Sequence, residues 1–362
     1  MGKDTQAGSD SARAMGRRAF LRQGALTLSG AGLASMVGSR PAGAQAPDKT
    51  QLVMVRHAGA TDDQGAGYPD IVTEMVNRCI RELTGKDSIA DAWRVFVSPD
   101  DVVGLKLNVR GGPRLSPQPC AVKAIVAGLV AAGVKENHVI IWDAWCRELP
   151  TAGFALSNSG QGTRCYGTDK GSLSPGENRS AEASRDAAKT YYSDTPVPVA
   201  DKAVYFSKIL SEEITALINI PLIKDHMIAG VTCSMKNHFG SILNPRDLHG
   251  NRCDPYLAEL NATALIKSKT RLIFVDGLRA LYNGGPRDHP KCRWRQNSFI
   301  AGTDPVAVDA LALRIIEEKR KEAGLEPIGD RARYIATAAR LGLGTDDFAR
   351  IDLREIDCAA PA

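Results

Sequence analysis

Residues 101–143 constrain the fold more than any other part of this 362-residue sequence. Asp101–Val109 is predicted to be a strand, a helix is expected from about Pro119 to Ala132, and His138–Trp142 is predicted to be the next strand. Two parallel strands need a crossover connection of a dozen residues or more, and such crossovers are right-handed. The segment therefore predicts an α/β fold, in which helices flank a largely parallel sheet.

Similar patterns on both sides of this unit extend the prediction to most of the chain. Further strands are expected at Gln51–Arg56, Val204–Phe206, Ala216–Pro221, Arg271–Val275 and Ser298–Ala301. Helices are expected at Pro69–Leu83, at Asp254–Lys267, after the Asp304-Pro305 pair and at Asp330–Leu341. Residues from about 150 to 198 are rich in Gly, Ser, Asn, Asp and Pro, which predicts a long irregular covering loop. We assign residues 45–345 to the α/β domain and residues 346–362 to a C-terminal tail.

Polar side chains recur where the predicted strands end. These residues are Lys106, Asn108, Asp143, Lys224, His226 and Asp276. The carboxyl ends of parallel strands share one edge of a sheet, so we expect these groups to converge in one crevice. Asp276 also fits a turn and Asp304 fits a helix cap, so neither of these two requires a site by itself.

The stretch Leu222–Gly240 (LIKDHMIAGVTCSMKNHFG) concentrates the polar groups of the expected site. If Met227–Phe239 is helical, its apolar residues share one face that packs on the core. Residues four positions apart lie side by side on a helix. Two such pairs fall away from the apolar face, Thr232 with Lys236 and Cys233 with Asn237.

Lysines beside Asn, Thr and flexible Gly-Gly-Pro turns are typical of a site for a small anion, such as a carboxylate or a phosphate. A buried lysine with a lowered pKa can also act as a general base. We predict catalytic roles for Lys236, His226 and Lys224. Ligand-binding roles are predicted for Lys106, Asn108, Thr232, Asn237, Asp143 and Asp276.

A metal site is the alternative interpretation of the same stretch, with His226, His249 and Cys233 as ligands. The histidine spacings match no short zinc motif, and none of the eight cysteines lies in a C-x-x-C motif. An iron–sulfur cluster therefore has little support from the sequence, and the cofactor stays unknown. The cysteines either remain buried free thiols or form disulfides, with Cys146–Cys165 and Cys253–Cys292 as the candidate pairs.

Residues 1–44 resemble a twin-arginine export signal. Arg17-Arg18 precedes a weakly hydrophobic run, Gly24–Gly38, and a small-residue cleavage site, Ala42-Gly43-Ala44. The run is too short to span a bilayer, so we expect no membrane anchor after cleavage. The expected partner is therefore the twin-arginine export machinery, and the expected location is the periplasm.

The net charge of +5 at pH 7 belongs mostly to this leader, which carries six basic and two acidic residues. Without the leader the net charge is about +1. A nucleic-acid partner needs a basic stripe on the folded domain, so we expect no nucleic-acid partner.

Several motifs together resemble the Domain-of-Unknown-Function-362 family. They occur in order over about residues 51–320 and comprise GLKLN (Gly104–Asn108), INIPLIKDH (Ile218–His226), AGVTCSMKNHFG (Ala229–Gly240), His249, FVDG (Phe274–Gly277) and IAGTDPVAVDA (Ile300–Ala310). The resemblance implies the domain of this family but no established reaction. Members often carry a ferredoxin-type iron–sulfur segment, and this chain lacks clustered cysteines of that kind.

The sequence favours an exported α/β protein that binds a small anionic molecule in a lysine–histidine pocket, with side chains suited to catalysis. Two alternatives remain open at this point. One is a metal- or iron–sulfur-associated redox protein, and the other is a non-catalytic binding module of the periplasm. The motifs G-x-S-x-G and G-x-G-x-x-G are absent, so hydrolase and dinucleotide-binding classes have no motif behind them.

Overall fold

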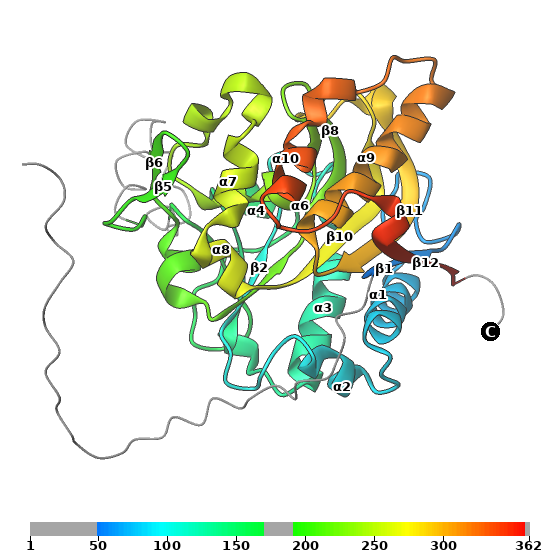
Figure 1. Ribbon diagram of the computed structural model, residues 1–362. Helices are drawn as coiled ribbons and strands as arrows, with labels where there is room; N and C mark the ends of the chain where they lie inside the picture. Colours follow the sequence, from blue (N-terminus) through cyan, green and yellow to red (C-terminus); the bar gives the residue numbers. More distant parts are fainter. Residues whose placement is uncertain (1–48, 170–190, 359–362) are drawn as a thin grey trace, which may run out of the picture. The chain divides into compact units, whose positions relative to one another are not determined.

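The computed structural model describes residues 49–169 and 191–358 as a ten-stranded mixed sheet with helices on both faces (Figure 1). The strand order is β12-β1-β11-β10-β7-β2-β3-β4, and β8 and β9 extend the sheet beside β10. The strands are β1 (Thr50–Arg56), β2 (Val103–Lys106), β3 (Val139–Asp143), β4 (Arg164–Gly167), β7 (Ala216–Asn219), β8 (Leu222–His226), β9 (Gly230–Thr232), β10 (Thr270–Leu281), β11 (Arg293–Gly302) and β12 (Ile351–Asp357). A separate hairpin joins β5 (Val197–Val199) to β6 (Lys202–Val204).

Most neighbouring strands of the large sheet are parallel. The run β10-β7-β2-β3-β4 is parallel throughout, β1 is parallel to β12, and β11 is antiparallel to both of its neighbours. The predicted α/β class with a largely parallel sheet is therefore confirmed. β2, the helix that follows it and β3 form the expected strand–helix–strand unit, although β2 is shorter than Asp101–Val109.

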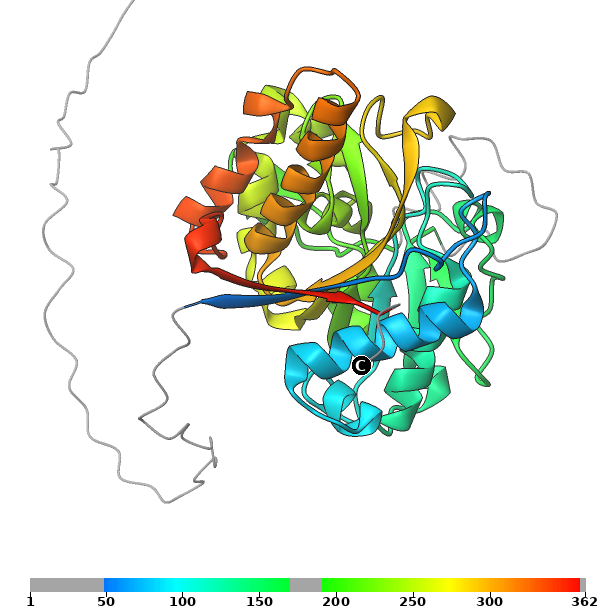
Figure 2. The same cartoon turned by 90° about the vertical axis from the view of Figure 1, so that its right-hand side faces the viewer.

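Helices cover the two faces of the sheet as separate layers (Figure 2). One layer contains α1 (Pro69–Thr84), α2 (Ile89–Arg94) and α3 (Pro119–Ala131), and the other contains α6 (Ser234–Asn237), α7 (Tyr256–Ala262), α8 (Ala264–Lys269), α9 (Pro305–Glu322) and α10 (Tyr334–Arg340). The short helix α4 (Glu148–Thr151) follows β3.

The two cores alternate along each strand, because successive side chains of a strand point to opposite faces. In β3, Val139 and Ile141 belong to the core beneath α1–α3, whereas Ile140 and Trp142 belong to the core beneath α6–α10. A strand buried on both faces needs a continuous apolar run, which explains the VIIW sequence of β3.

Asp304 is the N-cap of α9, as its position before Pro305 predicts. Its carboxylate accepts hydrogen bonds from the backbone N–H groups of Val306 and Ala307, both at 2.9 Å. Asp304 therefore has a structural role, which matches its interpretation as a cap.

The segment after β8 does not form the helix that its apolar spacing suggested. The chain turns at Met227–Ala229 and returns as β9, antiparallel to β8, and only Ser234–Asn237 is α-helical. Met227 and Ile228 lie at the tip of this hairpin with 64% and 40% of their surface exposed. The backbone pairing with β8 therefore prevailed over the helical spacing of the apolar residues.

The expected tail and covering loop also differ from the structure. Residues 351–357, assigned to a C-terminal tail, form the edge strand β12, whose parallel pairing with β1 satisfies the backbone groups along the outer side of β1. Within the loop expected at about 150–198, Arg164–Gly167 pairs with β3 as strand β4. Residues 170–190 of that loop lie outside the described residues.

All eight cysteines are free thiols, so the predicted disulfides are wrong. Cys165 belongs to the core beneath α1–α3, whereas Cys146 belongs to the opposite core. Cys253 and Cys292 also belong to different apolar clusters. In each pair the two thiols pack against different neighbours, although their separation along the sequence would allow a disulfide-closed loop.

The predicted signal peptide, residues 1–44, lies outside the described residues. Within 49–169 and 191–358, none of the helices combines the length and the apolar character that a membrane span requires.

Candidate functional site

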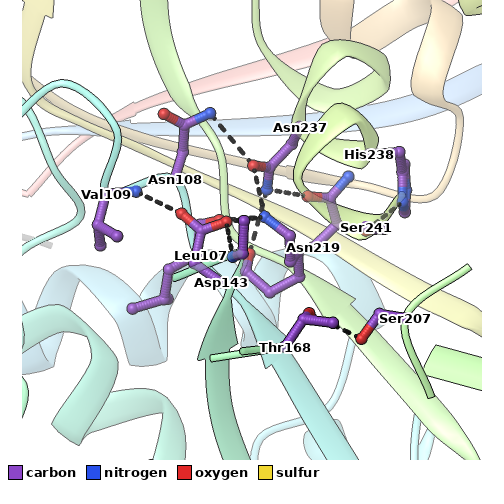
Figure 3. A network of polar contacts seen from close by, with 12 residues as sticks. Leu107, Asn108, Val109, Asp143, Thr168, Ser207, Asn219, Asn237, His238 and Ser241 are labelled. Carbon is purple, nitrogen blue, oxygen red and sulfur yellow. Dashed lines mark hydrogen bonds and ion pairs between the residues drawn. The ribbon is translucent and has the colours of Figure 1, made fainter. Parts of the chain in front are cut away.

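The carboxyl ends of three adjacent parallel strands bring Lys106, Asp143 and Asn219 together. Asn237 of α6 lies over these strand ends and next to Asn219 (Figure 3). Lys106 ends β2, Asp143 ends β3 and Asn219 ends β7. Strand ends in a parallel sheet share one edge, so the predicted convergence of Lys106, Asp143 and Asn237 is observed. Asn219 was not among the predicted site residues, although its place at the end of an apolar strand was a usable signal.

Lys106 is fully buried and uses all three of its N–H donors. Its Nζ donates to the Asp143 carboxylate at 2.7 Å, to the Leu107 carbonyl at 2.6 Å and to Asn237 Oδ1 at 3.2 Å. Burial lowers the pKa of Lys106, and the Asp143 carboxylate opposes that shift. Because every donor has a partner, we interpret the Lys106–Asp143 ion pair as a structural element that supports the site.

Asn237 connects this ion pair to the neighbouring strands. Its Oδ1 accepts from Lys106 and from Asn108 Nδ2 at 3.2 Å, and its Nδ2 donates to the Lys106 carbonyl at 3.1 Å and to Asn219 Oδ1 at 2.7 Å. All four hydrogen-bonding positions of the amide are therefore occupied. Gly240 follows closely, where an added Cβ would lie 2.7 Å from both Asp143 Oδ1 and Lys106 Nζ. The glycine at this position therefore lets the backbone approach the ion pair.

Lys224 lies next to this network on β8. Its Nζ donates to Asn108 Oδ1 at 2.9 Å, and its backbone is opposite Thr232 of β9. Burial lowers the pKa of Lys224 to about 8, Lys106 adds to that shift, and Asp143 opposes it. Thr232 lies beside Lys224 through strand pairing, not beside Lys236 through a helix, and its buried hydroxyl has no hydrogen-bond partner among the described residues.

Lys236 and His249 form the second part of the site. Lys236 Nζ lies 3.2 Å from His249 Nε2 and 3.5 Å from the centre of the Phe239 ring. His249 Nδ1 lies 2.8 Å from the Pro245 carbonyl, which only accepts, so the imidazole proton is on Nδ1. Nε2 of the neutral His249 is therefore an acceptor, and Lys236 donates to it.

Burial lowers the pKa of Lys236 to about 7, and the nearby charge of Lys224 adds to that shift. The Cys253 side chain opposes the shift only as a thiolate, and burial raises the pKa of that thiol. At neutral pH Lys236 therefore has no anionic neighbour from Cys253, and it exchanges between amine and ammonium.

His226 is neutral and has a defined tautomer. Its Nδ1 accepts hydrogen bonds from the backbone N–H groups of Ile228 at 3.1 Å and Ala229 at 3.2 Å, so its proton is on Nε2. Burial lowers the pKa of His226 to about 2, and Lys236 and His249 add to the effect. The ring centres of His226 and His249 are 5.8 Å apart, which places His226 with the Lys236–His249 pair.

Two buried aspartates lie beside the site, and the sequence interpretation gave a role to neither. Asp309 of α9 accepts from the backbone N–H groups of Ser234 at 2.7 Å and Met235 at 3.3 Å, so it holds the start of α6. Burial raises the pKa of Asp309 to about 7, although these hydrogen bonds favour the carboxylate. Asp225 lies near Arg331 at 3.5 Å and Arg320 at 3.9 Å. A lone acidic residue within an apolar helix stretch, as in VAVDALAL, was the available signal for Asp309.

Asp276 and Cys233 are not part of the lysine cluster. The Asp276 carboxylate accepts from the backbone N–H groups of Gln118 at 2.7 Å and Leu278 at 3.0 Å, so its role at the start of α3 is structural. Cys233 is buried in the core next to Asp309. Within 49–169 and 191–358, no three His, Cys, Asp or Glu side chains are placed to hold a metal ion, so His226, His249 and Cys233 do not form the predicted alternative site.

Comparison with known proteins gives a family and distant structural similarity. The family model described as "Domain of unknown function (DUF362)" matches residues 103–314. No curated protein matches the chain. A crystal structure of a Thermotoga maritima protein is similar over 72% of this chain, with 12% sequence identity and a TM-score of 0.40, and this chain spans 60% of the length of that protein.

Proposed function

The chain belongs to the Domain of unknown function (DUF362) family, and from that premise we propose that it binds a small anionic ligand at the lysine–histidine site. The observation that carries the proposal is the excess of buried positive charge. Lys106, Lys224 and Lys236 are 0%, 1% and 6% exposed, and among the described residues Asp143 is the one carboxylate in an ion pair with any of them.

Buried charges cost free energy unless a partner compensates them. Lys224 has a neutral amide as its partner, and Lys236 has a neutral imidazole and an aromatic ring. A carboxylate or phosphate group between them would supply the missing negative charge. The Nε2–H of His226 and the hydroxyl of Thr232 are additional neutral donors for such an anion.

We also propose that the site is catalytic, with Lys236 as the group that transfers a proton. A pKa near the working pH gives a side chain access to both protonation states, which general acid–base catalysis requires. As the neutral amine, Lys236 takes a proton from the bound ligand, and the electron pair of the broken bond stays on the ligand. Lys224, whose pKa is near 8, holds the anionic group as the ammonium.

The test is the Lys236→Met variant, which keeps most of the apolar stem and removes the charge. Isothermal titration at pH 7 with succinate and inorganic phosphate should show at least a tenfold weaker affinity, because one ion pair is lost. The melting temperature should stay unchanged or rise, because an uncompensated buried charge has been removed.

The matched control is Lys267→Met, which removes the same charge from an exposed position on α8. It should bind both anions like the wild type. If Lys236→Met melts lower and binds both anions normally, Lys236 is a structural residue and the proposal is wrong. Turnover of a metabolite pool by the wild type but not by Lys236→Met would separate an enzyme from a binding module.

We propose that the protein functions in the periplasm after twin-arginine export. Arg17-Arg18 and the small-residue site at Ala42-Gly43-Ala44 support this proposal. Changing both arginines to lysine should leave uncleaved precursor in the cytoplasm, as measured by fractionation and mass spectrometry. Normal cleavage of that variant, with a new N-terminus near Gln45, would contradict twin-arginine export.

A further inference from the structure

We propose that a second site, separate from the lysines, binds a single phosphate or sulfate group in a cavity lined by four arginines. The cavity has a volume of about 150 Å³, and its lining includes Asp63, Gly65, Arg114, Arg279, Arg293 and Arg295. None of these residues belongs to the lysine–histidine site. A water molecule occupies about 30 Å³ in the liquid, so the cavity suits one tetrahedral oxyanion with a few waters.

The strand register places three of the arginines on one face of the β10–β11 ribbon. Arg279 of β10 is directly opposite Arg295 of β11, and Arg293 lies two residues before Arg295 on the same strand. Residues two apart on a strand share a face, so the three side chains are neighbours. Like charges directly opposite each other destabilise an antiparallel pair, and an anion between them would offset that repulsion.

Two of the four arginines, Arg279 and Arg114, form no ion pair with a carboxylate among the described residues. Arg295 is 3.3 Å from the highly exposed Asp63, and Arg293 is 3.1 Å from Asp288. Arg279 donates to the Pro113 carbonyl at 3.3 Å, and its buried Nε has no hydrogen-bond partner within the described residues. Arg114 donates to Gln64 Oε1 at 3.4 Å. Guanidinium donors therefore remain available at the cavity.

The loop after β1 holds this arrangement in place. The Asp62 carboxylate accepts from the backbone N–H groups of Gln64 and Ala66, both at 2.8 Å. Gly65 has a φ of +76°, and a Cβ there would lie 2.8 Å from Cδ of Arg279, so the backbone packs on the arginine stem. Burial lowers the pKa of Arg279. The charges of Arg293 and Arg114 add to that shift, whereas the Asp276 carboxylate opposes it.

The geometry favours a tetrahedral oxyanion over a carboxylate. Arginine forks bind phosphate and carboxylate oxygens in pairs. A carboxylate presents two oxygens in one plane, which one or two guanidinium groups satisfy. Three arginines from the ribbon and a fourth from the loop after β2 suit a group whose oxygens point in several directions. The group is either a free ion or the end of a phosphomonoester.

The experiment is isothermal titration of the full chain at low ionic strength with inorganic phosphate, sulfate, glycerol phosphate and acetate. Arg279→Gln should weaken binding of the tetrahedral anions at least tenfold. Arg114→Gln, a substitution at an exposed loop position, should weaken binding of the tetrahedral anions about threefold to tenfold. This variant tests the proposal if Arg279→Gln does not fold. Arg340→Gln, which removes an exposed charge from α10, should bind like the wild type. Lys236→Met removes the anion site proposed at the lysines, so in that background Arg279→Gln should still weaken the remaining phosphate binding at least tenfold.

Acetate should bind at least tenfold more weakly than phosphate at this cavity. Tighter binding of glycerol phosphate than of inorganic phosphate would identify a phosphomonoester as the ligand, and equal affinities would identify a free oxyanion. Phosphate binding that is absent in the wild type, or unchanged in both Arg279→Gln and Arg114→Gln, would overturn the proposal. If Lys236→Met loses phosphate binding while both arginine variants keep it, the phosphate binds at the lysine site and the proposal is wrong.

Discussion

Replacing Asp143 with Asn should lower the free energy of unfolding by about 3–5 kcal/mol, because it leaves the buried Lys106 ammonium without its counter-charge. The Asp143 carboxylate accepts from Lys106 Nζ at 2.7 Å and from the backbone N–H groups of Val109 and Ala144, both at 2.8 Å. An amide of the same shape has only one acceptor oxygen. Urea denaturation at pH 7 measures the difference.

The double variant Lys106→Met with Asp143→Asn separates the lost charge from other effects. Removing both charges of a buried pair often costs little, so the double variant should be more stable than Asp143→Asn alone by at least about 1 kcal/mol. Asp91→Asn is the matched control, because Asp91 pairs with Arg94 at an exposed position. It should change stability by less than about 1 kcal/mol. Equal losses of stability in Asp143→Asn and Asp91→Asn would show that the buried ion pair does not support the structure of the site.

The stability advantage of Lys236→Met over the wild type should shrink as pH rises from about 7 to about 10. Burial lowers the pKa of Lys236 to about 7, whereas an unfolded lysine titrates near its ordinary value of 10.5. Between these two values the unfolded chain binds more protons than the folded one, so the free energy of unfolding of the wild type rises with pH. The contribution of Lys236 approaches about 4–5 kcal/mol over the full window, at about 1.4 kcal/mol for each pKa unit.

The difference between the two proteins is the quantity to measure, because the cysteine thiols of the unfolded chain also titrate in this range. Chemical denaturation of the wild type, Lys236→Met and Lys267→Met at half-unit pH steps gives three curves. Lys267→Met should follow the wild type, because its lysine is exposed. A constant difference between Lys236→Met and the wild type across the window would mean that Lys236 keeps an ordinary pKa. The base role proposed for it would then lose its support.

Lys106, Asp143 and Asn237 could be brought together from the sequence alone, because strand ends in a parallel sheet share one edge. That argument needs only the strand–helix–strand pattern of residues 101–143 and one further predicted strand at Ala216–Pro221. It does not say which polar groups pair. Lys106 is paired with the Asp143 carboxylate, whereas Lys236 has only neutral partners among the described residues. This difference depends on distances of 2.7–3.5 Å, which the spacing of residues in the sequence does not specify.

The sequence also could not distinguish the β8–β9 hairpin from a helix. Met227, Ile228, Val231 and Met235 have helical spacing, yet the first two lie exposed at the hairpin tip. Residues 351–357 contain alternating charged and apolar residues that also suit a solvated tail, and only the open edge of β1 makes them a strand. In both cases a hydrogen-bonding partner distant in space selected the local structure.

The sequence by itself determined the α/β class, the strand–helix–strand unit, the cap at Asp304 and the sheet edge at which the polar groups meet. These properties follow from local periodicity and from chain direction, and both depend only on the order of residues in the sequence. The tertiary structure decided the roles of Asn219 and Asp309, the tautomers of His226 and His249 and the face that each cysteine occupies. It also decided the arginine register at β10–β11, because these properties depend on which atoms of distant residues come within a few ångströms of one another.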